Sequence, residues 1–381
     1  MKREGRLFPI LVSDDNILTA IDTVNKTHRW CKSHRPNQTV KWVERTKPER
    51  VEELRRILSE GFVPSTVKIR TIYDKSSGKY RQICEPKLWP DQYVHHALVQ
   101  VIQPAIMRGM DYWCCGSIPG RGTARGTRGI QRWMREDSKG TKYCAELDIH
   151  HFYQTLKPEV VMTQMARIIK DRRVLERVRD TLRDGVPIGH YCSQWYANAV
   201  LEPLDHMIRE KLGVRHYVRY MDNFTLFGPS KKTLHKAVRE IDNWLKAQGM
   251  CLKSNWQVFP VKARMPNAMG YRFGRNYMLP RKKSVLRFKR LCRRVRKRMQ
   301  YGKSPSYAQA CSLMSRYGWL KHSNSCRLLT DWLKPLGVGR IKNVIRREAK
   351  KRNGKLKTKT ADPYYRVGGM IMRKCKEEMY G

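Results

Sequence analysis

Two aspartates occupy positions where their carboxylates could serve a metal ion. Asp148 ends a short apolar run, and Asp222 lies in a tight turn between two such runs. Carboxylates held close together by neighbouring strands repel each other unless a cation lies between them. Mg²⁺ prefers one or two carboxylates together with phosphate and water oxygens, and two such ions about 3.5–4 Å apart can serve in-line phosphoryl transfer. The alternative for each residue alone is structural, with Asp222 forming the turn and Asp148 capping its strand.

The order of the surrounding segments predicts how these aspartates would be positioned. Residues 142–149 are expected to form a strand, and residues 215–227 are expected to form a hairpin. Apolar residues at helical spacing predict one helix over 158–183, ended by Gly185, and another over about 193–212. A further helix is expected after the hairpin. This order predicts an α+β fold with helices packed on an antiparallel sheet.

Outside this region the pattern is mainly helical. Residues 1–66 are expected to be helical, residues 67–86 to form a hairpin around Ser-Ser-Gly, and residues 89–110 to form a helix. Residues 281–381 hold 30 Lys/Arg and 5 Asp/Glu. Helices are predicted near 283–299, 305–320 and 339–352, followed by a flexible basic arm.

Charge limits the classes of function. The chain has 79 Lys/Arg against 33 Asp/Glu, a net charge of +46 and a pI near 10.2, which favours a nucleic-acid partner over a merely solvated basic surface. No apolar run of about 18 residues occurs, so no membrane partner is expected. The 11 cysteines contain no C-x-x-C pair, which argues against a zinc ribbon or a disulfide framework. Scattered thiols fit a reducing cytoplasm, so we expect a cytoplasmic protein.

Around the two aspartates, the sequence resembles the palm of reverse transcriptases. Asp148-Ile-His-His-Phe-Tyr153 is similar to that family's first metal-binding motif, and Tyr220-Met-Asp222-Asn223 is similar to its Tyr-x-Asp-Asp hairpin. The resemblance covers roughly residues 67–280 and implies a right-hand polymerase fold of fingers, palm and helical thumb. It implies that Asp148, Asp222 and the Ile149 carbonyl hold two Mg²⁺ ions, which Mn²⁺ can replace. Asn223 replaces the family's second aspartate in the catalytic set, and this departure removes one charge.

The same resemblance assigns residues that would contact the incoming nucleotide. Tyr153 occupies the position of the aromatic residue that excludes a ribose 2′-hydroxyl, so a deoxynucleotide (dNTP) is the expected substrate; the alternative is a core aromatic. Residues 187–194, Pro-Ile-Gly-His-Tyr-Cys-Ser-Gln, match the nucleotide-positioning segment, and Ser193 could also be a helix N-cap. The full nucleotide-binding set is expected to comprise Arg81, Arg70, Lys68, Tyr153, Gly189 and Gln194.

A second set is assigned to the primer and template. Arg121 lies in a Gly-rich basic segment, residues 117–129, which resembles the part of the family that touches the nucleic-acid backbone. At the fourth palm motif, Trp256 occupies the position where the family often has a lysine that protonates pyrophosphate, with Lys253 nearby. Residues 268–273 match the primer-grip hairpin. The primer and template set is expected to comprise Arg121, Tyr220, Ser193, Gly270, Tyr271 and Lys253.

These assignments give a domain plan and three hypotheses for function. The plan is an N-terminal helical extension (1–66), fingers (67–147), palm (148–280), helical thumb (281–352) and basic tail (353–381). The form Gly-x-x-x-Ser-Gln resembles reverse transcriptases of diversity-generating retroelements. These enzymes copy a dedicated structured RNA into an RNA–cDNA duplex, in error-prone synthesis, with a small basic helical-bundle accessory protein. The alternatives are a defence-associated or orphan bacterial or phage reverse transcriptase with its own noncoding RNA, and a non-catalytic maturase-like RNA-binding factor.

Overall fold

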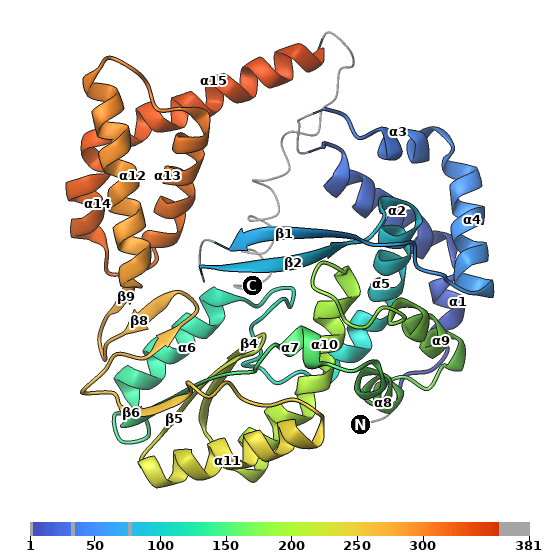
Figure 1. The fold of residues 1–381 in the computed structure, drawn as a ribbon, viewed down its shortest axis with the longest axis horizontal. Coiled ribbons are helices and arrows are strands. Elements are labelled where there is room, and N and C mark those ends of the chain that lie inside the picture. The colour runs from blue at the N-terminus through green and yellow to red at the C-terminus, as the bar shows by residue number, and fades with distance from the viewer. Residues whose placement is uncertain (1–2, 32–34, 75–77, 358–381) are drawn as a thin grey trace, which may run out of the picture. The chain divides into compact units, whose positions relative to one another are not determined.

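The chain divides into two compact units in a computed structural model that describes residues 3–31, 35–74 and 78–357. The first unit ends at Met269 and the second begins at Gly270. This division falls within the residues 148–280 that the sequence analysis assigned to the palm. Figure 1 labels most of the helices and strands of each unit.

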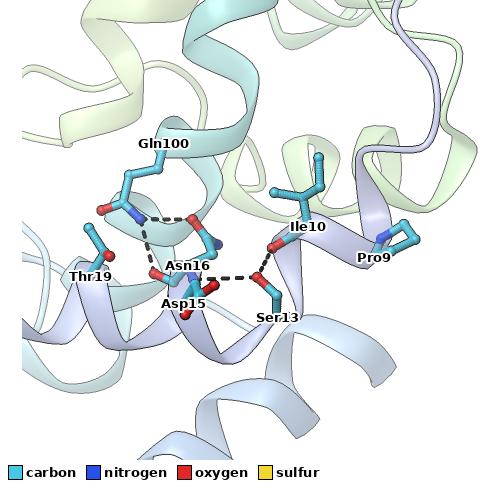
Figure 2. A pocket seen from close by; sticks show the side chains of 7 residues that line it. All are labelled: Pro9, Ile10, Ser13, Asp15, Asn16, Thr19 and Gln100. Carbon is cyan, nitrogen blue, oxygen red and sulfur yellow. Dashed lines mark hydrogen bonds between the residues drawn. The ribbon is translucent and has the colours of Figure 1, made fainter.

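The first unit begins with helices that pack around a shared apolar core. These are α1 (Phe8–Leu11), α2 (Asp14–His28), α3 (Gln38–Arg45) and α4 (Lys47–Glu60), as predicted for residues 1–66. The Ser13 side chain accepts a hydrogen bond from the Asn16 N–H and so caps α2. Figure 2 shows a pocket beside this cap, where the Gln100 side chain donates to the backbone carbonyl of Asn16.

The predicted hairpin and the helix after it are both present. Strands β1 (Lys68–Asp74) and β2 (Lys79–Glu85) pair antiparallel, with Ile72 opposite Arg81. A π-helical turn, η1 (Leu88–Gln92), leads into α5 (Tyr93–Gly109), and α6 (Thr123–Glu136) follows. Helix α5 is buried along most of its length because its apolar residues contact both α2 and α10 (Tyr191–His206).

The central sheet is antiparallel and has the strand order β4-β5-β3-β6. It consists of β3 (Tyr143–Asp148), β4 (His216–Tyr220), β5 (Asn223–Gly228) and β6 (Gln257–Pro260), so the predicted strand and hairpin are confirmed. Helix α11 (Lys231–Ala247) packs on β3, β5 and β6, and α6 packs on β4. Buried side chains of the central sheet and of the helices that pack on it form the core of this part of the unit. The unit ends with the short strand β7 (Asn267–Ala268).

The prediction of one helix over residues 158–183 is wrong. After the short α7 (Phe152–Thr155), the structure has α8 (Pro158–Ile168) and α9 (Arg172–Thr181). The chain is extended between them because Glu4 pairs with this segment through the bonds Glu4 N–H to Ile168 carbonyl (2.8 Å) and Lys170 N–H to Glu4 carbonyl (2.6 Å). A contact from the distant N-terminus therefore overrides the local helical pattern.

The start and end of the next helix also differ from the prediction. Helix α10 begins at Tyr191, its N-cap residue is His190, and it passes at His206 into a π-helical turn, η2 (Met207–Lys211). Ser193 therefore lies inside the first turn, and the prediction that it caps the helix is wrong. Ser193 is buried.

The second unit is a helical bundle preceded by a small hairpin. Strands β8 (Tyr271–Phe273) and β9 (Met278–Pro280) pair antiparallel. The helices are α12 (Lys282–Gln300), α13 (Tyr307–Leu320), α14 (Cys326–Trp332), the 3-10 turn η3 (Lys334–Leu336) and α15 (Val338–Lys357). The three predicted helices are present, and α14 was not predicted. Most of the predicted basic arm lies outside the described residues. Among the helices that the structure describes, none has the length and apolar character needed to cross a membrane.

Candidate active site

The strand register brings Asp148 and Asp222 to one edge of the central sheet. Asp148, the last residue of β3, lies opposite Asn223, the first residue of β5. Met221 and Asp222 form the turn between β4 and β5, since Tyr220 pairs with Asn223. The Ile149 N–H donates to the Asp222 carbonyl at 3.2 Å, which ties the end of β3 directly to this turn.

The two carboxylates influence each other electrostatically. Burial raises the pKa of Asp222 above its ordinary value, and the negative charge of Asp148 raises it further; Lys253 and Arg81 act in the opposite direction. The Lys253 Nζ lies 2.5 Å from Asp148 Oδ2. Asp148 Oδ1 is buried and has no hydrogen-bond partner. One buried carboxylate oxygen of the site is therefore left without a protein partner.

This donor set fits a hard divalent cation. The oxygens of Asp148 and Asp222 are ligands of the type that Mg²⁺ prefers, and the orphaned Oδ1 could be satisfied by a cation. Within the described part of the chain, no group of three or more His, Cys, Asp or Glu side chains could hold a metal ion. The protein ligands would therefore be these carboxylates and a backbone carbonyl such as that of Ile149, with substrate phosphates and water completing the shell.

Tyr153 lies within electrostatic reach of Asp222. It belongs to α7, a short helix whose preceding residue, His151, has the left-handed backbone angle φ +45°. Burial, together with the negative charge of Asp222, raises the pKa of the Tyr153 hydroxyl to about 12. The ring also packs at the margin of the main apolar core. Both the substrate-gate role and the core role that the sequence allowed are compatible with this position.

Basic residues of the β1–β2 hairpin face different partners. The charge of Arg81 lowers the pKa of Asp222, so this guanidinium lies within electrostatic reach of the turn. Its Nε also donates to Asp74 at 3.1 Å. Arg70 is ion-paired with Glu85 at 2.9 Å, and Lys68 lies opposite Glu85 in the strand register. Arg81 is thus the hairpin residue with the clearest electrostatic link to the aspartates.

Gly189 allows a close backbone contact with the same hairpin. Its φ is +119°, and a Cβ at this position would lie 2.2 Å from the Cys84 carbonyl oxygen. The Cys84 N–H donates to the neighbouring Ile188 carbonyl at 2.8 Å. Only glycine satisfies both the angle and the spacing. Gln194 follows in the first turn of α10 and is partly exposed.

The residues predicted to contact primer and template lie in separate parts of the chain. Tyr220 ends β4 next to the Asp222 turn and is partly exposed. Arg121 Nη1 donates to the backbone carbonyls of Asp111 (2.5 Å) and Cys114 (3.3 Å), so it already shapes the loop before α6. Gly270 and Tyr271 open the second unit, where the Tyr271 ring stacks on Trp319 with 4.7 Å between ring centroids.

The contacts of Lys253 and Trp256 show which of these two residues of the fourth motif lies at the candidate site. Lys253 reaches Asp148 with its side chain, and its N–H donates to the Asp148 carbonyl at 2.9 Å. Trp256 instead packs at the edge of the core, with its ring centroid 5.7 Å from that of His235. Of the two residues, Lys253 is the one that contacts the candidate site.

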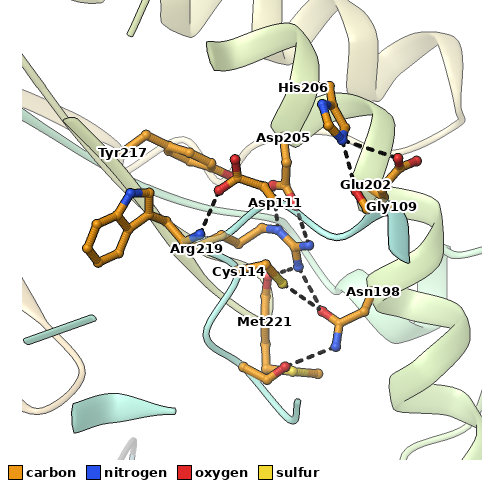
Figure 3. Close-up of polar contacts among 12 residues, drawn as sticks. Gly109, Asp111, Cys114, Asn198, Glu202, Asp205, His206, Tyr217, Arg219 and Met221 are labelled. Atoms are coloured by element: carbon orange, nitrogen blue, oxygen red, sulfur yellow. Dashed lines mark hydrogen bonds and ion pairs between the residues drawn. The ribbon is translucent and has the colours of Figure 1, made fainter. Parts of the chain in front are cut away.

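No sequence motif predicted the residues that support the turn. Arg219, Asp205 and Asn198 form a buried hydrogen-bonded network beneath it (Figure 3). Gly116 packs against the turn so closely that a Cβ on this residue would lie 2.4 Å from the Met221 nitrogen. A charged residue inside the apolar strand Tyr-Val-Arg-Tyr was the one available signal, because a buried arginine needs a partner.

The central part of the chain matches a known protein family. A family model described as "Reverse transcriptase (RNA-dependent DNA polymerase)" matches residues 72–272. No curated protein sequence matches the chain.

Solved structures that match include two of apo telomerase from Candida tropicalis. One, truncated from its C-terminal domain, is 14% identical with a TM-score of 0.45, and the match covers 56% of this chain and 55% of that chain. The other is 14% identical with a TM-score of 0.49, covering 79% and 60%. Telomerase from Candida albicans, in complex with a TWJ fragment of telomeric RNA, is 12% identical with a TM-score of 0.46, covering 84% and 66%. The chain spans 55% to 66% of the length of these solved chains.

Proposed function

The chain belongs to the reverse transcriptase (RNA-dependent DNA polymerase) family, and we propose that it copies an RNA template into complementary DNA. The observation that carries this proposal is the convergence of Asp148 and Asp222 at one sheet edge, with an orphaned buried oxygen on Asp148. The reaction would be nucleotidyl transfer from a dNTP to a primer 3′-hydroxyl. The large positive charge of the chain supports nucleic acid as its partner.

Asp148 and Asp222 would hold the metal ions, with the Ile149 carbonyl as a further ligand. When bound, two Mg²⁺ ions, which Mn²⁺ can replace, would supply the positive charge that activates the primer hydroxyl and stabilises the leaving pyrophosphate. Asn223 donates to Asp222 Oδ1 at 3.1 Å. It would therefore orient a ligand without being a charged ligand itself.

The nucleotide would be bound by residues from the hairpin, α7 and the segment before α10. Arg81 would bind its triphosphate, since a guanidinium fork matches phosphate oxygens, and Arg70 and Lys68 would add positive charge. Tyr153 would exclude a ribose 2′-hydroxyl. Gly189 would let the segment before α10 pack closely against Cys84 of the hairpin. Gln194 would contact the base pair being formed.

The primer and template would be bound mainly through their phosphates. Tyr220 would lie beneath the primer end, Ser193 would act within α10, and Arg121 would shape the loop that meets the nucleic-acid backbone. Gly270 and Tyr271 would form the primer grip. Lys253 would exchange its contact with Asp148 for the pyrophosphate and donate a proton to it.

For the biological setting, we propose a diversity-generating retroelement. The Gly-x-x-x-Ser-Gln segment at residues 189–194 supports this choice. The template would then be a dedicated structured RNA, and a small basic helical-bundle protein would be the accessory partner. A defence-associated enzyme with its own noncoding RNA would use the same chemistry. A template and variable repeat pair beside the gene would support the retroelement, and isolation among defence genes would support the alternative.

The activity is tested by extension of a labelled DNA primer on RNA with Mg²⁺ and dNTPs. We expect product from the wild-type chain and none from Asp222→Ala. Asp331→Ala removes an exposed carboxylate of α14 and should leave extension unchanged. Equal inertness of the wild type and Asp222→Ala on the cognate RNA, with RNA binding retained, would instead favour a maturase-like binding factor, which Asn223 also favours.

A further inference from the structure

A fully buried ion pair lies beneath the turn that carries Asp222. Arg219 belongs to β4 and Asp205 to α10, and both side chains have 0% exposure. Two parallel hydrogen bonds join them, from Arg219 Nε to Asp205 Oδ1 (2.7 Å) and from Nη2 to Oδ2 (2.6 Å). The Tyr217 hydroxyl donates a third bond to Asp205 Oδ1 at 2.5 Å. Figure 3 shows that Asp205 thereby anchors the guanidinium.

The remaining guanidinium nitrogen reaches the turn itself. Arg219 Nη1 donates to Asn198 Oδ1 (2.9 Å) and to the Met221 carbonyl (3.1 Å). Met221 has φ +56°, a left-handed conformation that is unfavourable for a residue with a side chain. The bonded carbonyl belongs to the peptide that leads into Asp222. Arg219 therefore holds in place a turn geometry that the backbone alone disfavours.

A second segment, residues 115 and 116, also packs against the turn. Asn198 Nδ2 donates to the Gly116 carbonyl at 2.9 Å, and the Cys115 N–H donates to the Arg219 carbonyl at 2.8 Å. A Cβ on Gly116 would lie 2.4 Å from the Met221 nitrogen. The backbone of Met221 is thus in contact with this segment at its nitrogen and with the guanidinium at its carbonyl.

Stability alone does not account for so much buried polarity. Replacing a buried ion pair by apolar side chains of similar volume is often neutral or stabilising. Such a replacement would fill the same space but could not donate to the Met221 carbonyl. What the charged network supplies, and an apolar core would not, is a fixed orientation of the peptide before Asp222.

We propose that Arg219 is a positioning residue, which acts through the Met221 carbonyl to fix the direction in which the Asp222 carboxylate faces Asp148. Asp205 and Asn198 hold Arg219 in the required orientation. The consequence for nucleotidyl transfer rests on the proposed function, whereas the consequences for metal binding and for the turn do not.

The test is a variant that removes the ion pair without leaving a charge unpaired. Tyr217→Phe, Asp205→Leu and Arg219→Met together roughly keep the side-chain volume and remove the ion pair and the hydroxyl bonded to it, while Asn198 keeps its bond to the Gly116 carbonyl. We expect a thermal midpoint near that of the wild type. We expect binding of Mn²⁺ alone, measured by electron paramagnetic resonance, to weaken about tenfold. The kcat of primer extension should fall by about tenfold to a hundredfold, with a smaller change in KM for the dNTP, because small displacements at a reacting centre have effects of this size.

A second variant keeps the test decisive if the triple variant does not fold. Arg219→Lys retains a charge beside Asp205, but its single nitrogen cannot serve Asp205, Asn198 and the Met221 carbonyl together. We expect faster hydrogen exchange at the backbone amides of 220–223, weaker Mn²⁺ binding and a lower kcat. Exchange elsewhere in the central sheet should stay at the wild-type rate.

The matched control is the pair Arg177 and Asp180 in α9, whose nearest nitrogen and oxygen are 3.1 Å apart and whose side chains are 8% and 23% exposed. Arg177→Met with Asp180→Asn should leave Mn²⁺ affinity and kcat unchanged. A folded triple variant with wild-type Mn²⁺ affinity, or an Arg219→Lys protein with wild-type exchange at the turn, would overturn the proposal. If the wild type extends no primer, the proposed function fails, while Mn²⁺ binding and exchange still decide the role of Arg219.

Discussion

Lys253 is bound to Asp148 at two points. Its Nζ lies 2.5 Å from Asp148 Oδ2, and its N–H donates to the Asp148 carbonyl at 2.9 Å. In the absence of a metal ion, this ammonium supplies the nearest positive charge to the pair of aspartates. Metal binding at Asp148 would therefore compete with Lys253.

This competition predicts the effect of Lys253→Met on metal-dependent stability. Without the ammonium, the repulsion between the aspartates is offset less, so the metal-free protein should melt at a lower temperature. Added Mg²⁺ should then raise the melting temperature more than it does in the wild type, since ligands stabilise the state they bind. Differential scanning fluorimetry with a Mg²⁺ titration measures both effects. Lys246→Met, which removes an exposed ion pair with Asp242, should leave the Mg²⁺ response unchanged.

Asn223→Asp should strengthen metal binding by restoring a third carboxylate. Residue 223 lies opposite Asp148 in the β3–β5 register. The added charge should lower the Mg²⁺ concentration for half-maximal stabilisation roughly three- to tenfold, as ligand charge tunes such sites. It should also lower the melting temperature of the metal-free protein, because like charges repel. Asn276→Asp, at an exposed position of the second unit, is the control, and an identical Mg²⁺ response in both variants would refute this placement of residue 223.

Gly189→Ala should destabilise the chain more than an alanine at another left-handed glycine. A Cβ at residue 189 would lie 2.2 Å from the Cys84 carbonyl, whereas a Cβ at Gly185, with φ +84°, would meet nothing within 4 Å. We expect a loss of about 2 kcal/mol or more for Gly189→Ala and about 1 kcal/mol for Gly185→Ala. Urea unfolding measures the difference, and equal losses would show that the contact with Cys84 is unimportant.

His95 predicts how stability depends on pH. Burial, together with the neighbouring His190 and His96, lowers the pKa of His95 from its ordinary value of 6.5 to about 3. Below pH 6.5 the unfolded chain binds a proton that the folded chain does not. The free energy of unfolding should therefore fall as the pH falls from 6.5 towards 3, with His95 contributing about 1.4 kcal/mol per pH unit.

The comparison is made between pH 6.5 and pH 5, before most carboxylates titrate. His95→Leu should show a shallower fall than the wild type over this interval in urea titrations. His322→Leu changes an exposed histidine and should keep the wild-type slope. A wild-type slope in the His95→Leu protein would mean that His95 takes up a proton equally in the folded and unfolded states.

The central features were predictable because they are local. The apolar run ending at Asp148 and the two runs flanking Asp222 each specify a strand, and a two-residue loop fixes their register. The sheet order then brings both aspartates to one edge. The hairpin at residues 68–85 was predictable for the same reason, since its turn residues lie between two alternating segments.

Two of the features that were missed depend on residues distant in sequence. The break between α8 and α9 arises from pairing with Glu4, which no local pattern reveals. The start of α10 at Tyr191 was missed because Ser193 offered a better local N-cap signal than His190, the residue that occupies this position. Arg219 finds its partner Asp205 on a helix that precedes its strand, so a single sequence shows the unusual buried charge but not what neutralises it.

Cleavage by bound iron tests the central claim most directly. Fe²⁺ in place of Mg²⁺, with ascorbate and peroxide, generates hydroxyl radicals that cut the backbone near the metal. We expect cuts beside both Asp148 and Asp222, suppressed by excess Mg²⁺ and lost in Asp222→Ala. Cuts confined to other segments, or cuts at both positions that persist in Asp222→Ala, would contradict the claim that these two carboxylates share a metal site.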